Sequence, residues 1–175
     1  MVLIGDSCID RSDNFGPGTY IIPNNSIPID GKISSWCIYS HAPSSSAKLK
    51  VFRIVGSTMV FVGETPITAI IYGLNSGLSA NINVQTGDLL GVYLSSNQGG
   101  AGDTSDPHNY YTKYNVDVTT DQLISYYTGY YSAGPFSFQA QTAKPASNII
   151  GRSSFSSRGA SVSGGISAGK GKKRG

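Results

Sequence analysis

The run Leu89–Leu94, Leu-Leu-Gly-Val-Tyr-Leu, is apolar throughout and too short for a helix of ordinary length. The polar turn Thr86-Gly87-Asp88 comes directly before it. A short apolar run entered through a Gly-Asp turn is typical of a buried strand. We therefore expect a central strand here, against which neighbouring segments pair or pack.

Short runs of the same kind continue to residue 142, and turn residues interrupt them about every 8–12 residues. The clearest is a predicted hairpin of residues 48–55 and 58–64, in which Gly56-Ser57 suits a two-residue type II′ turn. Further strands are predicted at residues 1–4, 19–22, 27–29, 32–41, 67–72, 78–84 and 136–142, with loops at 5–18 and 95–109. No segment carries a helical period. The pattern predicts an all-β fold, a two-sheet antiparallel and jelly-roll-like β-sandwich, with a closed barrel as the second interpretation.

Alternation within residues 32–41 assigns side chains to the two faces of the predicted strand. Ile33 and Cys37 are expected on one face, and Trp36 and Ile38 on the other. Trp36 is the only tryptophan of the chain, and we expect it to anchor the core.

The two cysteines, Cys8 and Cys37, leave two interpretations open. They could form a disulfide, or they could be two small buried side chains. A body of about 150 residues buries an adequate core without covalent staples, which favours the second interpretation.

Two predicted loops gather metal-ligating residue types: Asp6, Asp10 and Asp13 in the first, and Asp103, Asp106 and His108 in the second. Three carboxylates could hold Ca²⁺, but their spacing matches no EF-hand, and carboxylates that cap turns are the favoured interpretation. One His with two Asp forms no recognised ligand set. We expect no metal and no cofactor.

Seven of the eleven tyrosines fall between residues 110 and 131, and six of them are paired: Tyr110, Tyr111, Tyr126, Tyr127, Tyr130 and Tyr131. Paired residues in a strand point one side chain inward and the other outward. Outward rings combine an apolar body with a polar tip, which suits stacking on sugars or a protein contact. Aromatic cover over the rim of a sandwich is the equal alternative.

Charge divides the chain into two parts. Residues 1–150 hold seven basic and ten acidic residues, a net charge of −3, whereas residues 151–175 hold six basic residues and no acidic one. Residues 151–175 also include seven Ser and seven Gly, a composition that does not fold by itself. We predict a sandwich domain at 1–150 and an extended, Ser/Gly-rich basic C-terminal arm at 151–175.

The arm buries too little apolar surface within its own domain to offset the entropy lost on ordering it. We therefore expect it to lie across a neighbouring subunit, through residues Phe155, Arg158, Val162, Ile166, Lys170, Lys172, Lys173 and Arg174. Direct contact with nucleic acid is the less favoured alternative, because so few charges bind a phosphate backbone weakly.

Catalysis is not predicted. The sequence has two His, a single Glu, and none of the Gly-x-Ser-x-Gly, phosphate-loop or His-Glu-x-x-His motifs. No apolar run approaches the roughly 20 residues of a membrane helix, so we expect no membrane partner. The first four residues are too short for the apolar region of an export signal, and none is predicted.

Several segments of residues 5–95 resemble β-sandwich domains of bacteriophage and prophage structural proteins. They are Asp10-Arg11, residues 16–20 (Gly-Pro-Gly-Thr-Tyr), residues 31–36 (Gly-Lys-Ile-Ser-Ser-Trp) and residues 84–93 (Val-Gln-Thr-Gly-Asp-Leu-Leu-Gly-Val-Tyr). Such domains decorate phage heads or tails and sometimes contact host glycans, so the resemblance implies a place in the virion.

We therefore expect a non-enzymatic structural subunit of a virus particle, capsid-decorating or tail-associated. Its partners would be other virion subunits, either its own copies or the major capsid or tail protein. The alternative is a carbohydrate-binding or adhesion module, which the sandwich, the tyrosines and a charged fraction of 13% also fit.

Overall fold

The computed structural model describes residues 1–97, 99–102, 108–133 and 135–143. The described elements are strands apart from one 3-10 turn, η1, so the all-β prediction is confirmed. They are β1 (Val2–Gly5), β2 (Asp13–Phe15), β3 (Gly18–Ser26), β4 (Gly31–Ser40), β5 (Ser45–Val55), β6 (Thr58–Glu64), β7 (Thr68–Ile70), β8 (Gly73–Val84), β9 (Leu89–Leu94), β10 (Gly100–Gly102), β11 (His108–Tyr114), β12 (Gln122–Leu123), η1 (Ile124–Tyr126), β13 (Thr128–Ala133) and β14 (Phe138–Ala143).

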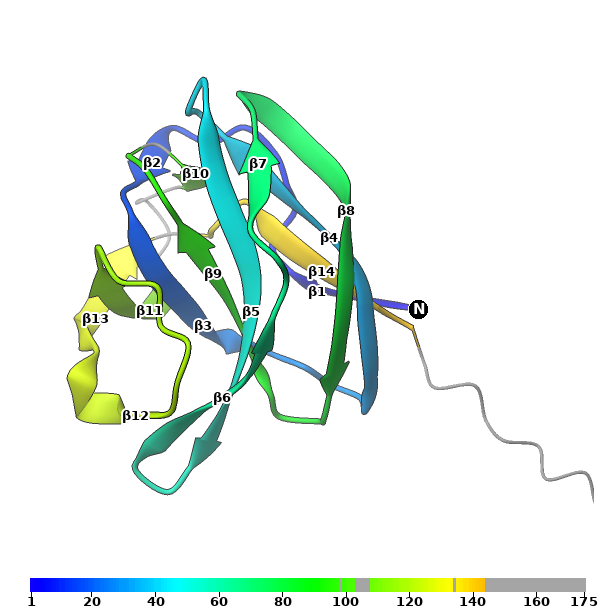
Figure 1. Ribbon diagram of the computed structural model, residues 1–175, viewed down its shortest axis with the longest axis vertical. Helices are drawn as coiled ribbons and strands as arrows, with labels where there is room; N and C mark the ends of the chain where they lie inside the picture. Colours follow the sequence, from blue (N-terminus) through cyan, green and yellow to red (C-terminus); the bar gives the residue numbers. More distant parts are fainter. Residues whose placement is uncertain (98, 103–107, 134, 144–175) are drawn as a thin grey trace, which may run out of the picture.

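Two antiparallel sheets pack face to face, as the sandwich prediction requires (Figure 1). The smaller sheet has the order β1-β14-β4-β8. The larger has the order β12-β6-β5-β9-β3-β11-β13, and β7 pairs with β5 beside that path. The short strands β2 and β10 form a separate ribbon within segments predicted as loops.

The main hydrophobic core lies between the sheets and takes side chains from both. Its largest fully buried members include Trp36, Tyr110, Phe136, Phe138, Ile22, Ile33, Ile38 and Leu49. Trp36 thus lies in the core as predicted. Burying a side chain of this size contributes roughly 1.5–3 kcal/mol, so this layer dominates the stability of the sandwich.

Strand β9 occupies the middle of the larger sheet, between β5 and β3, which confirms the central-strand prediction. Gly87 supplies the turn before it with a left-handed φ of 91°. The buried Asp88 carboxylate accepts two hydrogen bonds from the Arg53 guanidinium, at 2.6 and 3.0 Å, and one from the backbone N–H of Gln85 at 2.8 Å. The turn is therefore held by a paired, fully bonded charge.

The predicted hairpin is β5–β6, with Ile54 paired to Met59 and Val55 to Thr58. Gly56 has a φ of 60°. A positive φ at the first central residue, with an ordinary φ at the second, is the pattern of a type II′ turn.

Strand β3 runs through Pro23, where the sequence predicted an end. The pairing of β3 with β9 shifts register between Ile22 and Ser26, so Pro23 sits where no ladder hydrogen bond is required of it. The predicted edge strand at 27–29 does not form. Ile27 instead donates its N–H to the carbonyl of Asp88 at 2.7 Å.

The face assignment within β4 was wrong for Ile33. Ile33 is buried on the same side as Trp36 and Ile38, because the pairing with β8 shifts register between Ile33 and Ser35. A bulge of this kind breaks the alternation of side chains that a regular strand would keep.

The segment 115–121 crosses the outer face of the larger sheet, from β11 to β12. It seals a second hydrophobic cluster there, made of Ile21, Phe52, Met59, Leu89, Val118 and Tyr127. Thr19 Oγ1 donates to the carbonyl of Val116 at 2.8 Å and accepts from the N–H of Val118 at 3.1 Å. Asp121 accepts from the N–H of Phe61 at 2.8 Å. The outer face of this sheet is thus covered by the chain's own crossing segment.

Two lysines of β5 are neutralised beneath that crossing segment. Lys50 is fully buried and contacts Glu64, Asp117 at 2.6 Å and the carbonyl of Val118 at 2.8 Å. Lys48 contacts Glu64 at 2.8 Å and Asp117 at 2.6 Å. Burial raises the pKa of Asp117, but the hydrogen bonds from Lys48 and Lys50 outweigh it and leave the pKa below its ordinary value.

Cys8 and Cys37 form a disulfide, with their Cα atoms 6.2 Å apart, so the favoured interpretation as two unpaired buried side chains was wrong. Neither residue lies in the hydrophobic core, and Cys37 stands half-buried on the outer face of the smaller sheet. The bond ties the loop after β1 to β4. Arg11 adds a second tie by donating to Ser137 Oγ at 2.8 Å.

Candidate functional site

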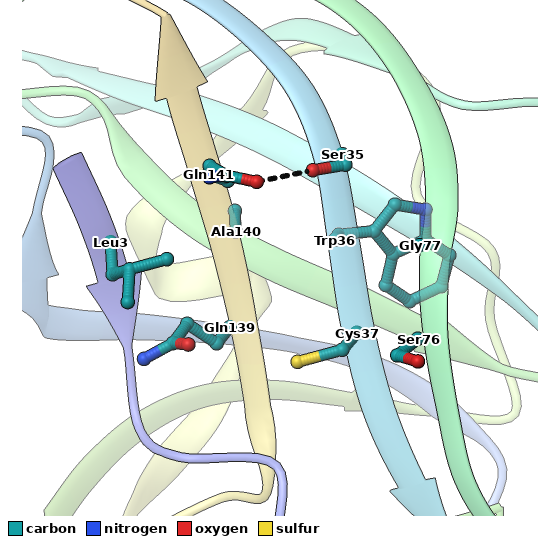
Figure 2. Close-up of a pocket in the computed structure, with 9 residues that line it drawn as sticks. All are labelled: Leu3, Ser35, Trp36, Cys37, Ser76, Gly77, Gln139, Ala140 and Gln141. Atoms are coloured by element: carbon teal, nitrogen blue, oxygen red, sulfur yellow. Dashed lines mark hydrogen bonds between the residues drawn. The ribbon is translucent and has the colours of Figure 1, made fainter. Parts of the chain in front are cut away.

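The outer face of the smaller sheet carries a hollow of about 230 Å³ (Figure 2). Its lining comes from all four strands of the sheet: Leu3 from β1, Ser35, Trp36 and Cys37 from β4, Ser76 and Gly77 from β8, and Gln139, Ala140 and Gln141 from β14. We call this hollow the groove. None of its lining residues is charged.

A bulge in β8 widens the sheet at the groove. Trp36 pairs with Leu78 and Ile38 with Asn75, so Ser76 and Gly77 together lie opposite Cys37. Gly77 has a φ of 66°, a left-handed conformation that glycine adopts without strain. A Cβ on this glycine would meet no atom within 4 Å. The bulge therefore leaves open space at Gly77, on the strand next to Cys37.

The outer face of the sheet at the groove follows two cross-strand rows, which place Gln139, Gln141 and Ser35 side by side. Leu3, Gln141, Ser35 and Ser79 follow one another in register across the four strands. Gly5, Gln139 and Cys37 form the next row. Alternation along β14 sends Phe138 and Ala140 into the core, which turns both glutamines toward solvent.

The amide of Gln141 is held in place but keeps hydrogen-bonding capacity. Its Oε1 accepts from Ser35 Oγ at 2.8 Å, while its Nε2 contacts the thioether sulfur of Met1. A thioether is a weak acceptor, so the amide N–H groups keep donor capacity for a stronger one. Gln139 reaches the carbonyl of Gly5 at 3.5 Å, the outer limit of a hydrogen bond.

A second polar cluster lies where β4 ends. His41 Nε2 contacts Asp10 Oδ1 at 2.7 Å, and His41 Nδ1 contacts the side chain of Asn14. The imidazole stacks on Tyr72, at 6.0 Å between ring centroids, and meets the edge of Tyr39. The hydrogen bond from His41 holds the pKa of Asp10 below its usual value. These contacts fix the first loop to the end of β4.

In the first loop that gathers metal-ligating residue types, Asp6 and Asp10 have separate partners. Asp6 accepts the backbone N–H of Phe136 at 3.2 Å, and Asp10 binds His41. Within the described residues, no group of three His, Cys, Asp or Glu side chains is placed to hold a metal ion. In the second loop, Asp103, Asp106 and the side chain of His108 lie outside the described residues.

The two tyrosine pairs whose side chains the structure describes, at residues 110–111 and 126–127, each place one ring in the interior. Tyr110 and Tyr127 are buried, which removes both from the predicted contact surface. Burial raises the pKa of Tyr127 to about 12. Tyr111 and Tyr126 are half-buried against the second hydrophobic cluster. The side chains of Tyr130 and Tyr131 lie outside the described residues, as do the whole arm and the predicted boundary at residue 150.

Sequence reasoning missed every polar residue of the groove. Gln139, Gln141 and Ser35 alternate with apolar positions and read as solvent-facing positions of ordinary strands. The available signal was the lack of charge at those positions, since exposed strand faces usually carry Lys, Glu or Arg.

No protein-family model, no curated protein and no solved structure matches this chain. The resemblance of residues 5–95 to phage structural domains therefore stays a prediction. Across the described ranges, no helix has the length and apolar character of a membrane span.

Proposed function

We propose that this chain is a non-enzymatic structural subunit of a virus particle, capsid-decorating or tail-associated, whose arm tethers it to neighbouring subunits. One observation carries the assembly role: an exposed apolar patch at the entry to β8. Ile71, Tyr72 and Leu74 are 66%, 60% and 55% exposed within four consecutive positions. Large apolar side chains that are exposed close together in the chain are candidates for an interaction surface.

The charge division of the chain supports the tether. The body carries a net charge of −3, and the arm carries six basic residues without an acidic one. Opposite charges attract the arm of one copy to the body of another and steer their encounter. The virion assignment itself rests on the resemblance of residues 5–95.

The disulfide supports a location outside a reducing cytosol. Disulfides persist at virion and cell surfaces and are rare where thiols are kept reduced. A surface-decorating subunit meets that condition.

Deletion of residues 151–175 tests the tether. We expect the full chain to associate with itself or with its particle, and the truncated chain to lose that association in sedimentation velocity and co-purification. A matched variant that replaces Lys170, Lys172, Lys173 and Arg174 by Gln separates the charge of the arm from its length. Incorporation unchanged by the deletion would refute the tether.

A second function, adhesion to glycans, is favoured by the uncharged polar lining of the groove. Binding of the full chain to a glycan array tests it directly. An array without a bound glycan would leave assembly as the proposed function.

A further inference from the structure

The smaller sheet is almost free of charge. Among the residues of β1, β4, β8 and β14, Lys32 is the single charged side chain. A charged ligand on this face would lose hydration without gaining a counter-charge. The groove therefore selects a neutral ligand.

The walls of the groove match a ligand rich in hydroxyl groups. Each serine hydroxyl and each glutamine amide both donates and accepts, and a sugar hydroxyl needs both from its partner. Gln139, Gln141, Ser35 and Ser76 gather such groups around one hollow. The row of Ser79, Asn81 and Asn83 continues the same chemistry along the exposed side of β8.

The groove also offers an apolar surface beside its polar walls. Leu3 is 61% exposed, and Figure 2 shows it across β14 from Ser35 and Cys37. The disulfide at Cys37 adds a second weakly polar surface. A sugar ring presents C–H groups as well as hydroxyls, so it can contact both kinds of surface at once.

The size of the groove limits what it can hold. Its volume of about 230 Å³ is below the roughly 300–1,000 Å³ of pockets that enclose drug-sized ligands. One ring-sized unit fits, while the rest of a longer ligand would lie along the polar row of β8.

From these observations we propose that the groove binds one ring of a neutral saccharide, with Gln139 and Gln141 as its main hydrogen-bonding residues. The proposal rests on the adhesion function above and assigns its site and ligand class. Ser35 acts as a positioning residue, since its hydroxyl orients the Gln141 amide.

Trp36 provides an internal reporter for the test. It is the only tryptophan of the chain and it borders the groove, while its indole is buried in the core behind β4, so its fluorescence reports a change of β4 when a ligand binds. The full chain is titrated with glucose, galactose, mannose and N-acetylglucosamine and with their trimers, and with galacturonic acid and sialic acid as charged comparators. We expect a saturable change with at least one neutral sugar and none with the acids.

Gln139→Ala and Gln141→Ala should each weaken binding about 3- to 10-fold, the range of one hydrogen bond. Gln122→Ala, on β12 of the larger sheet, is the matched control and should bind as the parent does. Near-ultraviolet circular dichroism checks that each variant keeps its fold.

Each other outcome overturns the proposal in a distinct way. Tighter binding of the acidic sugars contradicts the neutral ligand class. If glycans on the array bind and neither glutamine variant weakens that binding, the adhesion function stands but the groove is not its site. No binding of any sugar in either assay removes the site and the adhesion function together, and leaves the assembly function standing.

Discussion

The outer faces of the two sheets differ in how far the chain covers them and in how much charge they carry. The larger sheet covers its outer face with residues 115–121 and buries Lys50 among carboxylates beneath them. The smaller sheet keeps exposed side chains on its outer face, among them Leu3, Ser34 and Ser79, and carries Lys32 as its single charge. Charge is thus concentrated where the chain seals itself, and neutral polar groups where the surface stays available to a partner.

The physical basis of this difference is the free energy that is needed to remove a charged group from water. A buried cation is tolerated when several oxygens surround it, and removing one partner leaves the others uncompensated. An open face of amides and serines carries no such penalty, because water satisfies those groups until a ligand replaces it. The covered face therefore stabilises the fold, and the open face is free to bind.

The largest loss of stability is expected for a lysine substitution in the larger sheet, with a lysine of the smaller sheet as its control. Lys50→Ala should cost about 3–5 kcal/mol, because it removes a fully buried cation from between Glu64 and Asp117 and leaves Lys48 as their one remaining partner lysine among the described residues. Lys32→Ala on the exposed strand of the smaller sheet should stay within about 0.5 kcal/mol. Urea denaturation measures both. Similar losses at the two positions would break the contrast between the sheets.

The disulfide comes next. The double variant Cys8→Ser, Cys37→Ser removes a disulfide with a sequence separation of 29. We expect the free energy of unfolding to fall by about 3–4 kcal/mol, because the unfolded chain gains conformational entropy without the cross-link. Thermal unfolding of the parent protein with and without dithiothreitol measures the stability that the disulfide contributes. The double variant is the control, because the reductant should leave its melting temperature unchanged.

A smaller effect is expected at the bulge that opens the groove. Gly77→Ala should cost about 1–2 kcal/mol, since its φ of 66° is unfavourable for a residue with a Cβ, although space is available. Ser76→Ala beside it should cost less than about 0.5 kcal/mol. Thermal melts compare the two, and equal losses would show that the left-handed conformation is not required.

The smallest effect is expected for the loss of stability at low pH that arises from Asp117 on the covered face of the larger sheet. The pKa of Asp117 lies below its unfolded value of about 3.9, so its contribution is fully present above that pH and is lost as the pH falls further. Its side chain keeps 27% exposure, so solvent screens part of the interaction. Asp117→Asn should flatten the pH dependence of the urea midpoint between about pH 5 and 2. Parent and variant curves that stay parallel would remove Asp117 from the acid response.

Local chemistry allowed the sequence to predict the strands and turns. Gly56-Ser57 marks the β5–β6 hairpin, and Gly87-Asp88 marks the entry to β9, because both turns need a residue that adopts a positive φ. These features depend on neighbours in the sequence, and they agree with the structure.

Features that depend on distant parts of the chain were missed. A single bulge places Ile33 on the other face of β4 from the one predicted. No local sequence pattern marks the residue at which the pairing with a neighbouring strand shifts register. Cys8 and Cys37 meet because the first loop folds over β4, which no spacing reveals. The groove joins residues as far apart as Leu3 and Gln141, and only the strand order brings them together.

The pairing of β1 with β14 has a mechanical consequence. Val2 lies opposite Thr142, so the start of β1 and the end of β14 lie side by side at one end of the sheet. A pull between those ends loads the ladder one hydrogen bond at a time, as in a zipper, instead of shearing the whole strand at once. Tension applied in this direction should peel β1 away at low force while the core beneath the other strands stays closed.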